Sequence, residues 1–171
     1  ALRSLLFEAT ADRLRCRGPV GASLSGGLDS SSVAAVAAAV TARRSGGAPL
    51  RAYTYAFDRF AEYDERPWAR LVTDHCGFLP VDVPCDELWP LADPASWPVE
   101  RDFVLFDPFV LLPAAVRDAA RGDGCRLLLV GHHSDLLFWG GQYWLAEALR
   151  DGRLVAALAG LTLGGKSVRW R

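Results

Sequence analysis

The sequence predicts an α/β fold, with an open, mostly parallel sheet that carries helices on both faces. Short apolar runs alternate along the chain with longer runs of helical spacing, which is the pattern of such folds. The run Arg126–Val130 is almost continuously apolar, as in a central parallel strand that is covered on both sides. A stretch rich in glycine and serine, Ser25–Ser32, joins an earlier apolar run to a helix, so strand, turn and helix begin a βαβ unit.

Length and composition indicate one globular domain, 1–171. Of the 171 residues, 51% are hydrophobic and 23% are charged, which is enough apolar material for a core. The net charge of −1 gives no electrostatic reason to expect a nucleic-acid or membrane partner. No apolar run reaches the length of a membrane span, and no signal-peptide pattern opens the chain. The four cysteines form no Cys-x-x-Cys pair, so we expect reduced thiols in a cytoplasmic protein.

Apolar spacing and turn residues define the elements expected in the first half. Residues 1–16 form an amphipathic helix. Its expected apolar face consists of Leu2, Leu5, Leu6, Ala9 and Leu14. The expected strands are 20–24, 50–57 and 78–83, and the helices between them are 33–44 and 63–76.

The second half begins with a proline-rich loop over 84–108, which we expect to cover one face and to contain a short helix around Leu88. A helix over 109–121 and the strand 126–130 follow, and two further helices are expected over 143–150 and 153–161. Ligands of such sheets bind beyond the carboxyl ends of strands, where the strand order reverses. The polar loops after Leu24 and Val130 leave strand ends of this kind.

The stretch after Leu24 has the composition of a phosphate-binding turn. Gly26 and Gly27 have no Cβ, so the backbone can turn sharply and an anion can approach its N–H groups. The following helix offers its first N–H groups and the positive end of its dipole, and Ser25 and Ser30 add hydroxyls. The stretch lacks the ending of a Walker A loop and the spacing of a dinucleotide fingerprint. A turn that only links strand to helix is the alternative.

The pattern Ser-Gly-Gly-Leu-Asp-Ser at Ser25–Ser30 resembles the pyrophosphate loop of the N-type ATP pyrophosphatases, the PP-loop group with an adenine nucleotide alpha hydrolase-like fold. With Leu28 and three serines, it is most similar to the synthetase domain of the asparagine synthetase family. The resemblance implies cleavage of ATP between its α- and β-phosphates. It also implies an ATP and pyrophosphate site that consists of Leu24, Ser25, Gly26, Gly27, Asp29, Ser30 and Gly131.

The segment Gly131–Gly140 resembles the family's Gly-x-Gly-Gly/Ser-Asp-Glu-Leu-Phe-x-Gly segment. The resemblance implies that Asp29 and Asp135 hold the Mg²⁺ that bridges the ATP phosphates, in line with the preference of Mg²⁺ for oxygen ligands. A helix N-cap at Asp135 is the alternative. Leu136 replaces the family's Glu, and His132 stands where asparagine synthetases have Glu and β-lactam synthetase has Tyr. His132 is therefore our candidate catalytic base, and the two departures put aspartate as the substrate in doubt.

Three weaker features allow two interpretations each. The segment Tyr63–Glu65 resembles a family stretch after the second strand and is equally an acidic helix start. Leu24 and residues 54–57 occupy positions that flank adenine in the family, and they are equally core residues. Cys125 and the pair His132–His133 could bind zinc, but they are few and lie at opposite ends of a strand, so ordinary packing is favoured.

The resemblance implies a carbon–nitrogen ligase similar to the glutamine-hydrolysing asparagine synthase of asparagine biosynthesis. Such an enzyme uses ATP and Mg²⁺ to activate a carboxylate as an acyl-adenylate and then forms an amide. The expected substrate is a small-molecule or peptide carboxylate. A cyclase of the same family that forms a β-lactam or a macrolactam is the alternative, as is a non-catalytic ATP-binding remnant. Near the expected mouth, only Arg66, Arg70 and Arg101 could bind a free aspartate.

Parts of the family's enzyme have no counterpart in this sequence. No segment matches the glutaminase domain that releases ammonia, so a glutaminase domain or another ammonia source is an expected partner. The one lysine, Lys166, is too close to Asp135 to match the family's catalytic lysine. Because the chain also has no Met and begins at Ala1, we expect an incomplete synthetase-type domain from a longer product.

Overall fold

A computed structural model describes residues 2–43, 49–88, 110–132, 149–153 and 155. The chain divides into two compact units, Ala1–His132 and His133–Arg171, and most described residues belong to the first. Within the described ranges, no helix is long and apolar enough to cross a membrane. The helices expected over 143–150 and 153–161 fall largely outside these ranges, and the single-domain assignment stays a prediction.

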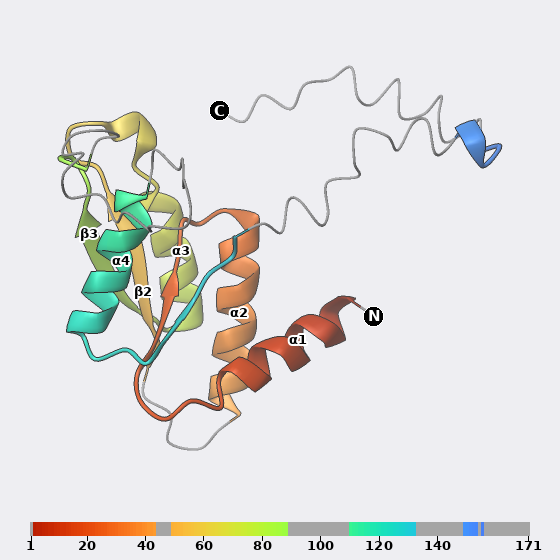
Figure 1. Ribbon diagram of the computed structural model, residues 1–171, viewed down its shortest axis with the longest axis horizontal. Helices are drawn as coiled ribbons and strands as arrows, with labels where there is room; N and C mark the ends of the chain where they lie inside the picture. The colour runs from red at the N-terminus through yellow and green to blue at the C-terminus, as the bar shows by residue number, and fades with distance from the viewer. Residues whose placement is uncertain (1, 44–48, 89–109, 133–148, 154, 156–171) are drawn as a thin grey trace, which may run out of the picture. The chain divides into compact units, whose positions relative to one another are not determined.

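The first unit alternates helices and strands along the chain, as predicted (Figure 1). Its helices are α1 (Leu2–Arg13), α2 (Leu28–Ala42), α3 (Arg66–Cys76) and α4 (Leu111–Gly122), and a 3₁₀ turn, η1 (Ala61–Tyr63), precedes α3. Its strands are β1 (Val20–Ser23), β2 (Arg51–Ala56), β3 (Leu79–Pro84) and β4 (Leu127–Leu129).

The strands form one parallel sheet in the order β3-β2-β1-β4. β1 lies inside the sheet, where Gly21 is opposite Arg51 of β2 and Leu128 of β4. The chain runs outward from β1 through β2 to β3, and β4 then pairs with the other edge of β1. The strand order therefore reverses beside β1, and the carboxyl ends of β1 and β4 are the expected position of a ligand site.

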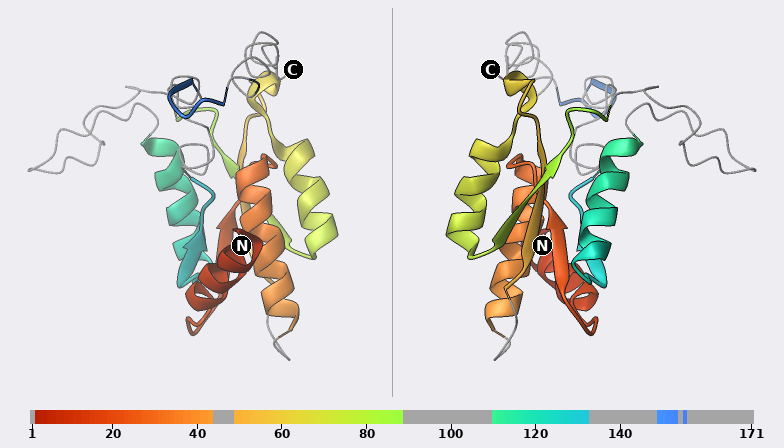
Figure 2. Two further views of the ribbon diagram at one scale, coloured as in Figure 1. Left: turned by 90° about the vertical axis from the view of Figure 1, so that its right-hand side faces the viewer. Right: turned by 90° about the vertical axis from the view of Figure 1, so that its left-hand side faces the viewer.

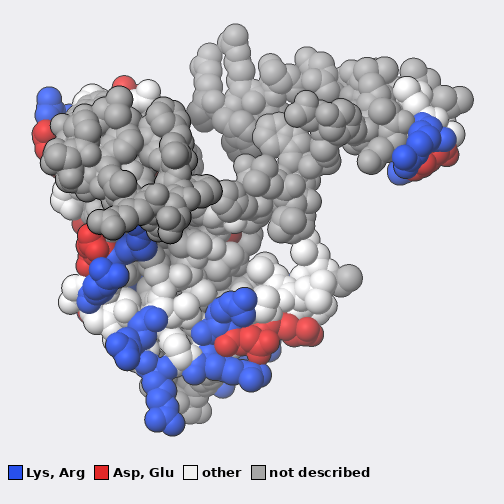
Figure 3. Space-filling model, in the orientation of Figure 1, with Lys and Arg blue, Asp and Glu red and all other residues white. Residues whose placement is uncertain are grey.

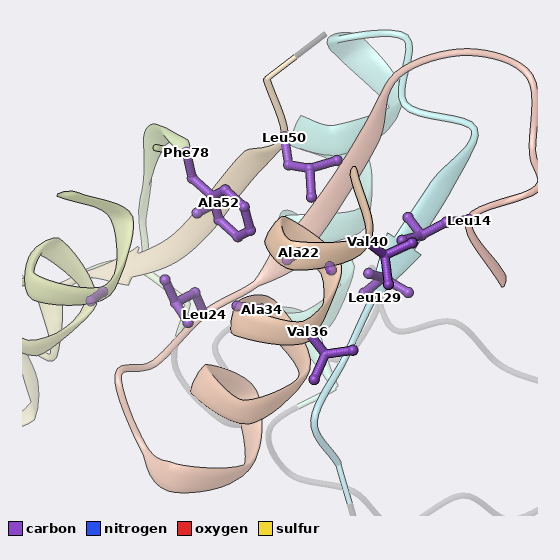
Figure 4. Packing of buried hydrophobic residues seen from close by; sticks show 12 residues of the cluster. Leu14, Ala22, Leu24, Ala34, Val36, Val40, Leu50, Ala52, Phe78 and Leu129 are labelled. Atoms are coloured by element: carbon purple, nitrogen blue, oxygen red, sulfur yellow. The ribbon is translucent and has the colours of Figure 1, made fainter. Parts of the chain in front are cut away.

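Helices cover both faces of this sheet, which confirms the predicted fold class (Figure 2). On one face, α1, α2 and α3 enclose the larger core, in which Leu24, Ala34 and Leu129 lie between α2 and the strands (Figure 4). On the other face, Val116 of α4 packs near Tyr53 of β2. β1 is thus covered on both faces and paired on both edges, so the loop that follows it starts from a fixed point.

Two of the predicted helices begin elsewhere. α2 begins at Leu28 rather than near Val33, so the glycine- and serine-rich stretch itself forms the first turn. α3 begins at Arg66 rather than at Tyr63, which ends η1. Pro67 lies in the first turn of α3, where the fixed φ of proline suits a helix start. The acidic pair that was expected inside this helix therefore lies before it.

The apolar face predicted for α1 was wrong in part. Leu2, Leu5 and Ala9 are exposed. Leu14 is buried just after the helix, and Leu6 packs against the same core. Both stripes of α1 contain leucine, so periodicity did not distinguish the stripe that packs on α2.

Candidate functional site

The loop after β1 leads directly into the N-terminus of α2. Gly26 has a left-handed φ of +80°, which glycine adopts without strain, and Gly27 immediately precedes the helix. The N-cap residue Gly27 has no side chain to cap this helix end, and Asp29 lies in its first turn. Backbone donors and the positive end of a helix dipole thus lie beyond the carboxyl end of β1, an arrangement that binds phosphate in other proteins.

Two serine hydroxyls connect the ends of the loop. The Oγ atoms of Ser25 and Ser30 are 3.0 Å apart. The Ser30 Oγ accepts the N–H of Ser25 at 3.3 Å and donates to the C=O of Gly27 at 3.3 Å. The Ser25 Oγ accepts the N–H of Gly27 at 3.2 Å. Hydroxyl oxygens therefore bind backbone N–H groups of this loop in the way that the oxygens of a phosphate would.

Backbone segments pack closely against the loop at two glycines. A Cβ at Gly26 would lie 2.5 Å from the Cβ of Trp68, in the first turn of α3. A Cβ at Gly131, two residues after β4, would lie 2.5 Å from the backbone N of Ser30 and 2.7 Å from the backbone C of Asp29. Gly131, the first residue of the second motif, therefore contacts the first motif where the strand order reverses, and Figure 1 shows the chain after β4 rising beside the start of α2.

Leu24 joins β1 to the loop and is 1% exposed. Its side chain lies in the core. Its N–H donates to the C=O of Tyr53 at 2.9 Å, and its C=O accepts the hydroxyl of Thr54 at 2.8 Å. β2 thus binds both backbone polar groups of the residue that precedes the loop.

Arg66, at the start of α3, is bound by two carboxylates. Its Nη2 lies 2.6 Å from Oδ1 of Asp58, and its Nε lies 2.8 Å from Oδ1 of Asp64. Burial raises the pKa of Asp64, but hydrogen bonds from Arg66 outweigh burial and lower this pKa below its ordinary value. The hydrogen bonds to Asp64 and Asp58 also raise the pKa of Arg66. The positive charge of this guanidinium is therefore balanced by two carboxylates from the segment that precedes α3.

Arg70 is paired in a similar way. Its Nη2 lies 2.7 Å and 2.6 Å from the two carboxylate oxygens of Asp82 in β3. On the face that Figure 3 shows, acidic side chains lie beside several arginines. Arg101, the third cation expected near the mouth, lies outside the described residues. Both expected cations that can be placed are thus engaged by carboxylates of the protein.

Asp86 closes the loop after β2, a role that the sequence analysis missed. Its carboxylate accepts the backbone N–H groups of Asp58 at 3.0 Å and of Arg59 at 2.9 Å. Of the short helix that we expected around Leu88, the structure describes only the residues up to Leu88, which form a turn in which the N–H of Leu88 donates to the C=O of Cys85 at 3.0 Å. An aspartate in a turn often binds backbone N–H groups, and this was the available signal.

The components of the suggested zinc site lie at opposite ends of β4. Before the strand, the Sγ of Cys125 is 3.2 Å from the hydroxyl of buried Tyr53, which donates to Oδ2 of Asp123 at 2.8 Å. Burial raises the pKa of Tyr53, and the hydrogen bonds to Cys125 and Asp123 raise it further. His132 follows the strand and is exposed. In the part of the chain that the structure describes, no group of three or more His, Cys, Asp or Glu side chains could hold a metal ion.

One of the two expected magnesium ligands can be placed. Asp29 is partly exposed in the first turn of α2, beside Gly131, whereas Asp135 lies outside the described residues. One carboxylate near serine hydroxyls and backbone N–H groups does not form an all-protein cage. It does fit Mg²⁺, which proteins often bind through one or two carboxylates together with substrate phosphates and water.

Fold and site together define an open, parallel α/β domain with a glycine- and serine-rich loop at a helix N-terminus, where its strand order reverses. A family model described as asparagine synthase matches residues 1–170, and the chain belongs to this family. A relative from Methanocaldococcus jannaschii is named "Putative asparagine synthetase (glutamine-hydrolyzing) 2". It is 38% identical over 73 residues, which are 43% of this chain and 13% of the relative. The match therefore spans only a small part of the relative's length.

Among solved structures, the chain is similar to the U34-tRNA thiolase NcsA from Methanococcus maripaludis with its 4Fe-4S cluster. The TM-score is 0.49 and the sequence identity is 17%, over 99% of this chain and 56% of the thiolase. The family assignment rests on the match to the asparagine synthase model, which confirms the resemblance that the two motifs indicated. This family uses ATP.

Proposed function

We propose that this chain is the ATP-binding part of a ligase that forms an amide, AMP and pyrophosphate. One observation carries the proposal: the segment after β4 packs so closely on the first turn of α2 that a Cβ at Gly131 would lie 2.5 Å from the backbone N of Ser30. Gly131, which begins the second family motif, therefore lies against the first motif at the position where open α/β sheets bind ligands. Membership of the asparagine synthase family supports the same assignment.

The proposed reaction has two steps. A carboxylate oxygen of the substrate attacks the α-phosphorus of ATP, the bond from this phosphorus to the bridging oxygen breaks, and pyrophosphate leaves with that oxygen. An amine nitrogen then attacks the carbonyl carbon of the acyl-adenylate, and the bond from this carbon to the oxygen of AMP breaks. A base takes the proton that the nitrogen loses.

The loop and the two motif residues have distinct proposed roles. Ser25–Gly27 and Ser30 bind the pyrophosphate, whose oxygens replace the serine hydroxyls as acceptors of the backbone N–H groups. Asp29, together with Asp135, would hold Mg²⁺, which offsets phosphate charge when it is bound. His132, exposed directly after Gly131, serves as the base for the amine.

Substrate-dependent release of pyrophosphate from the full-length protein tests this proposal. We expect Asp29→Ala to lower the rate by about tenfold or more, because a Mg²⁺ ligand is lost. Asp74→Ala, which removes an exposed carboxylate of α3, is the matched control and should leave the rate unchanged. Equal rates in wild type and Asp29→Ala would contradict the assignment of Asp29. Binding of ATP–Mg²⁺ without turnover would indicate a non-catalytic remnant.

Arg66 and Arg70 are each paired with aspartates of the protein, and this favours a second candidate, a cyclase that forms a β-lactam or a macrolactam. A free aspartate has two carboxylates, and their desolvation is costly without cationic partners. Both arginines already bind carboxylates of the protein. In a cyclisation the amine belongs to the same molecule as the activated carboxylate, so no ammonia source is needed, whereas asparagine-type amidation would use a glutaminase partner. Aspartate- and glutamine-dependent formation of AMP by the full-length protein would reject the cyclase.

A further inference from the structure

We propose that Thr54 of β2 is a positioning residue for the pyrophosphate loop, an inference that rests on the proposed function. Thr54 is 5% exposed, so it acts from within the core. Its hydroxyl donates to the C=O of Leu24 at 2.8 Å, and this hydrogen bond is buried. Leu24 is followed directly by Ser25, so the bond holds the peptide group from which the loop starts.

The end of the β1–β2 ladder explains why a side chain supplies this donor. Ser23 opposite Tyr53 is the last register pair between the two strands, and the N–H of Leu24 then donates to the C=O of Tyr53 at 2.9 Å. Beyond this point β1 turns into the loop, while the C=O of Leu24 is still buried. A buried carbonyl without a partner is costly, and the hydroxyl of Thr54 satisfies it where the regular ladder stops.

The planar peptide group transmits this bond to the loop. In the peptide between Leu24 and Ser25, the C=O of Leu24 and the N–H of Ser25 point in opposite directions. When the hydroxyl of Thr54 fixes the C=O, the N–H of Ser25 is aimed away from β2. It donates there to the Oγ of Ser30 at 3.3 Å, the hydroxyl that the pyrophosphate is proposed to replace. Thr54 therefore determines the direction of a backbone donor that it does not itself touch.

Titration of the full-length protein with ATP–Mg²⁺ tests this role. Thr54→Val keeps the shape of the side chain and removes the hydroxyl, and we expect the Kd to rise about tenfold. Thr54→Ser restores the donor and should bind within about threefold of wild type. Thr73→Val is the matched control, because the buried Thr73 hydroxyl also donates to a backbone carbonyl, that of Arg70 at 2.9 Å, but within α3. This variant loses a comparable hydrogen bond and should bind like wild type.

The outcomes separate the inference from the proposed function. Wild-type protein that does not bind ATP–Mg²⁺ would overturn the proposed function. If wild type binds, a Thr54→Val affinity within twofold of wild type would overturn the role of Thr54. An equal loss in Thr73→Val would also overturn it, because lower stability alone would then explain the effect. If Thr54→Val does not fold, Thr54→Cys, whose thiol is a weak donor, takes its place with the same expected loss.

Discussion

Two loops at the same edge of the sheet keep their shapes by different means. The loop after β1 is shaped by close backbone packing at Gly26 and by the hydroxyls of Ser25 and Ser30. The loop after β2 is held by the ion pairs of Arg66 and by the carboxylate of Asp86. The first loop thus presents neutral backbone N–H donors. At the second loop, the guanidinium of Arg66 forms ion pairs with the carboxylates of Asp58 and Asp64.

This difference assigns different ligands to the two loops. A helix N-terminus and backbone N–H groups can bind a phosphate without any cationic side chain. A guanidinium that already binds two carboxylates, as Arg66 does, is a poor partner for a further carboxylate. We therefore propose that the pyrophosphate end of ATP binds at the first loop, and we expect other groups than Arg66 to recognise the substrate carboxylate.

The largest effect is expected at Gly26. Gly26→Ala places a side chain at a φ of +80° and brings its Cβ to 2.5 Å from the Cβ of Trp68. We expect a loss of about 1–2 kcal/mol from the left-handed conformation and about 1–3 kcal/mol more from overpacking. Urea unfolding gives the stability, and titration with ATP–Mg²⁺ should show that binding is lost.

Gly77→Ala is the matched control for this substitution. Gly77 has a φ of +69°, but nothing lies within 4 Å of the position of its Cβ. It should therefore show the conformational loss alone, and ATP–Mg²⁺ binding should be unchanged. Equal losses of stability and affinity in Gly26→Ala and Gly77→Ala would show that packing on Trp68 does not shape the loop.

A smaller effect is expected at Arg66 in the loop after β2. Its partner Asp64 has a lowered pKa in the folded protein, so this pair stabilises the fold above the ordinary carboxyl pKa of about 4. The stabilisation is lost as the pH falls through the lowered pKa. We expect Arg66→Ala to cost about 1–2 kcal/mol at pH 7, and the difference from wild type should shrink below about pH 4.

Urea unfolding of both proteins at pH 7 and pH 3 measures this difference. Arg121→Ala is the control, because the Arg121–Asp118 pair is 82% and 72% exposed and should contribute less than about 0.5 kcal/mol. A difference between Arg66→Ala and wild type that is the same at both pH values would contradict the proposed role of the ion pairs.

Local patterns were enough to predict the alternation of strands and helices and the glycine-rich turn between β1 and α2. Gly26 and Gly27 lie directly between an apolar run and a helix, so turn chemistry and position agree. The wrong stripe of α1 and the wrong start of α3 have different causes. Leucine recurs on two stripes of α1, and nothing local shows which stripe packs on α2. Pro67, in contrast, is a local signal for the start of α3 that the prediction did not use.

Local sequence patterns could not predict contacts between segments that are distant in the chain. Thr54 and Leu24 are neighbours only because β2 pairs with β1, and Thr54 has the sequence context of an ordinary strand residue. The pairing of Arg70 with Asp82 likewise depends on α3 lying over β3. The sequence predicted three arginines near the expected mouth, but it could not show that carboxylates of the protein bind Arg66 and Arg70.

The central claim is that Gly131, the first residue of the second motif, packs on the first motif in one ATP site, and Gly131→Ala tests it most directly. The new Cβ would lie 2.5 Å from the backbone N of Ser30, so the first turn of α2 and the chain after β4 must move apart. Titration of the full-length protein with ATP–Mg²⁺ should show a Kd that is raised about tenfold or more in this variant. Gly122→Ala, where nothing lies within 4 Å of the new Cβ, should bind like wild type. Wild-type affinity in Gly131→Ala would contradict the claim that the two motifs form one ATP site.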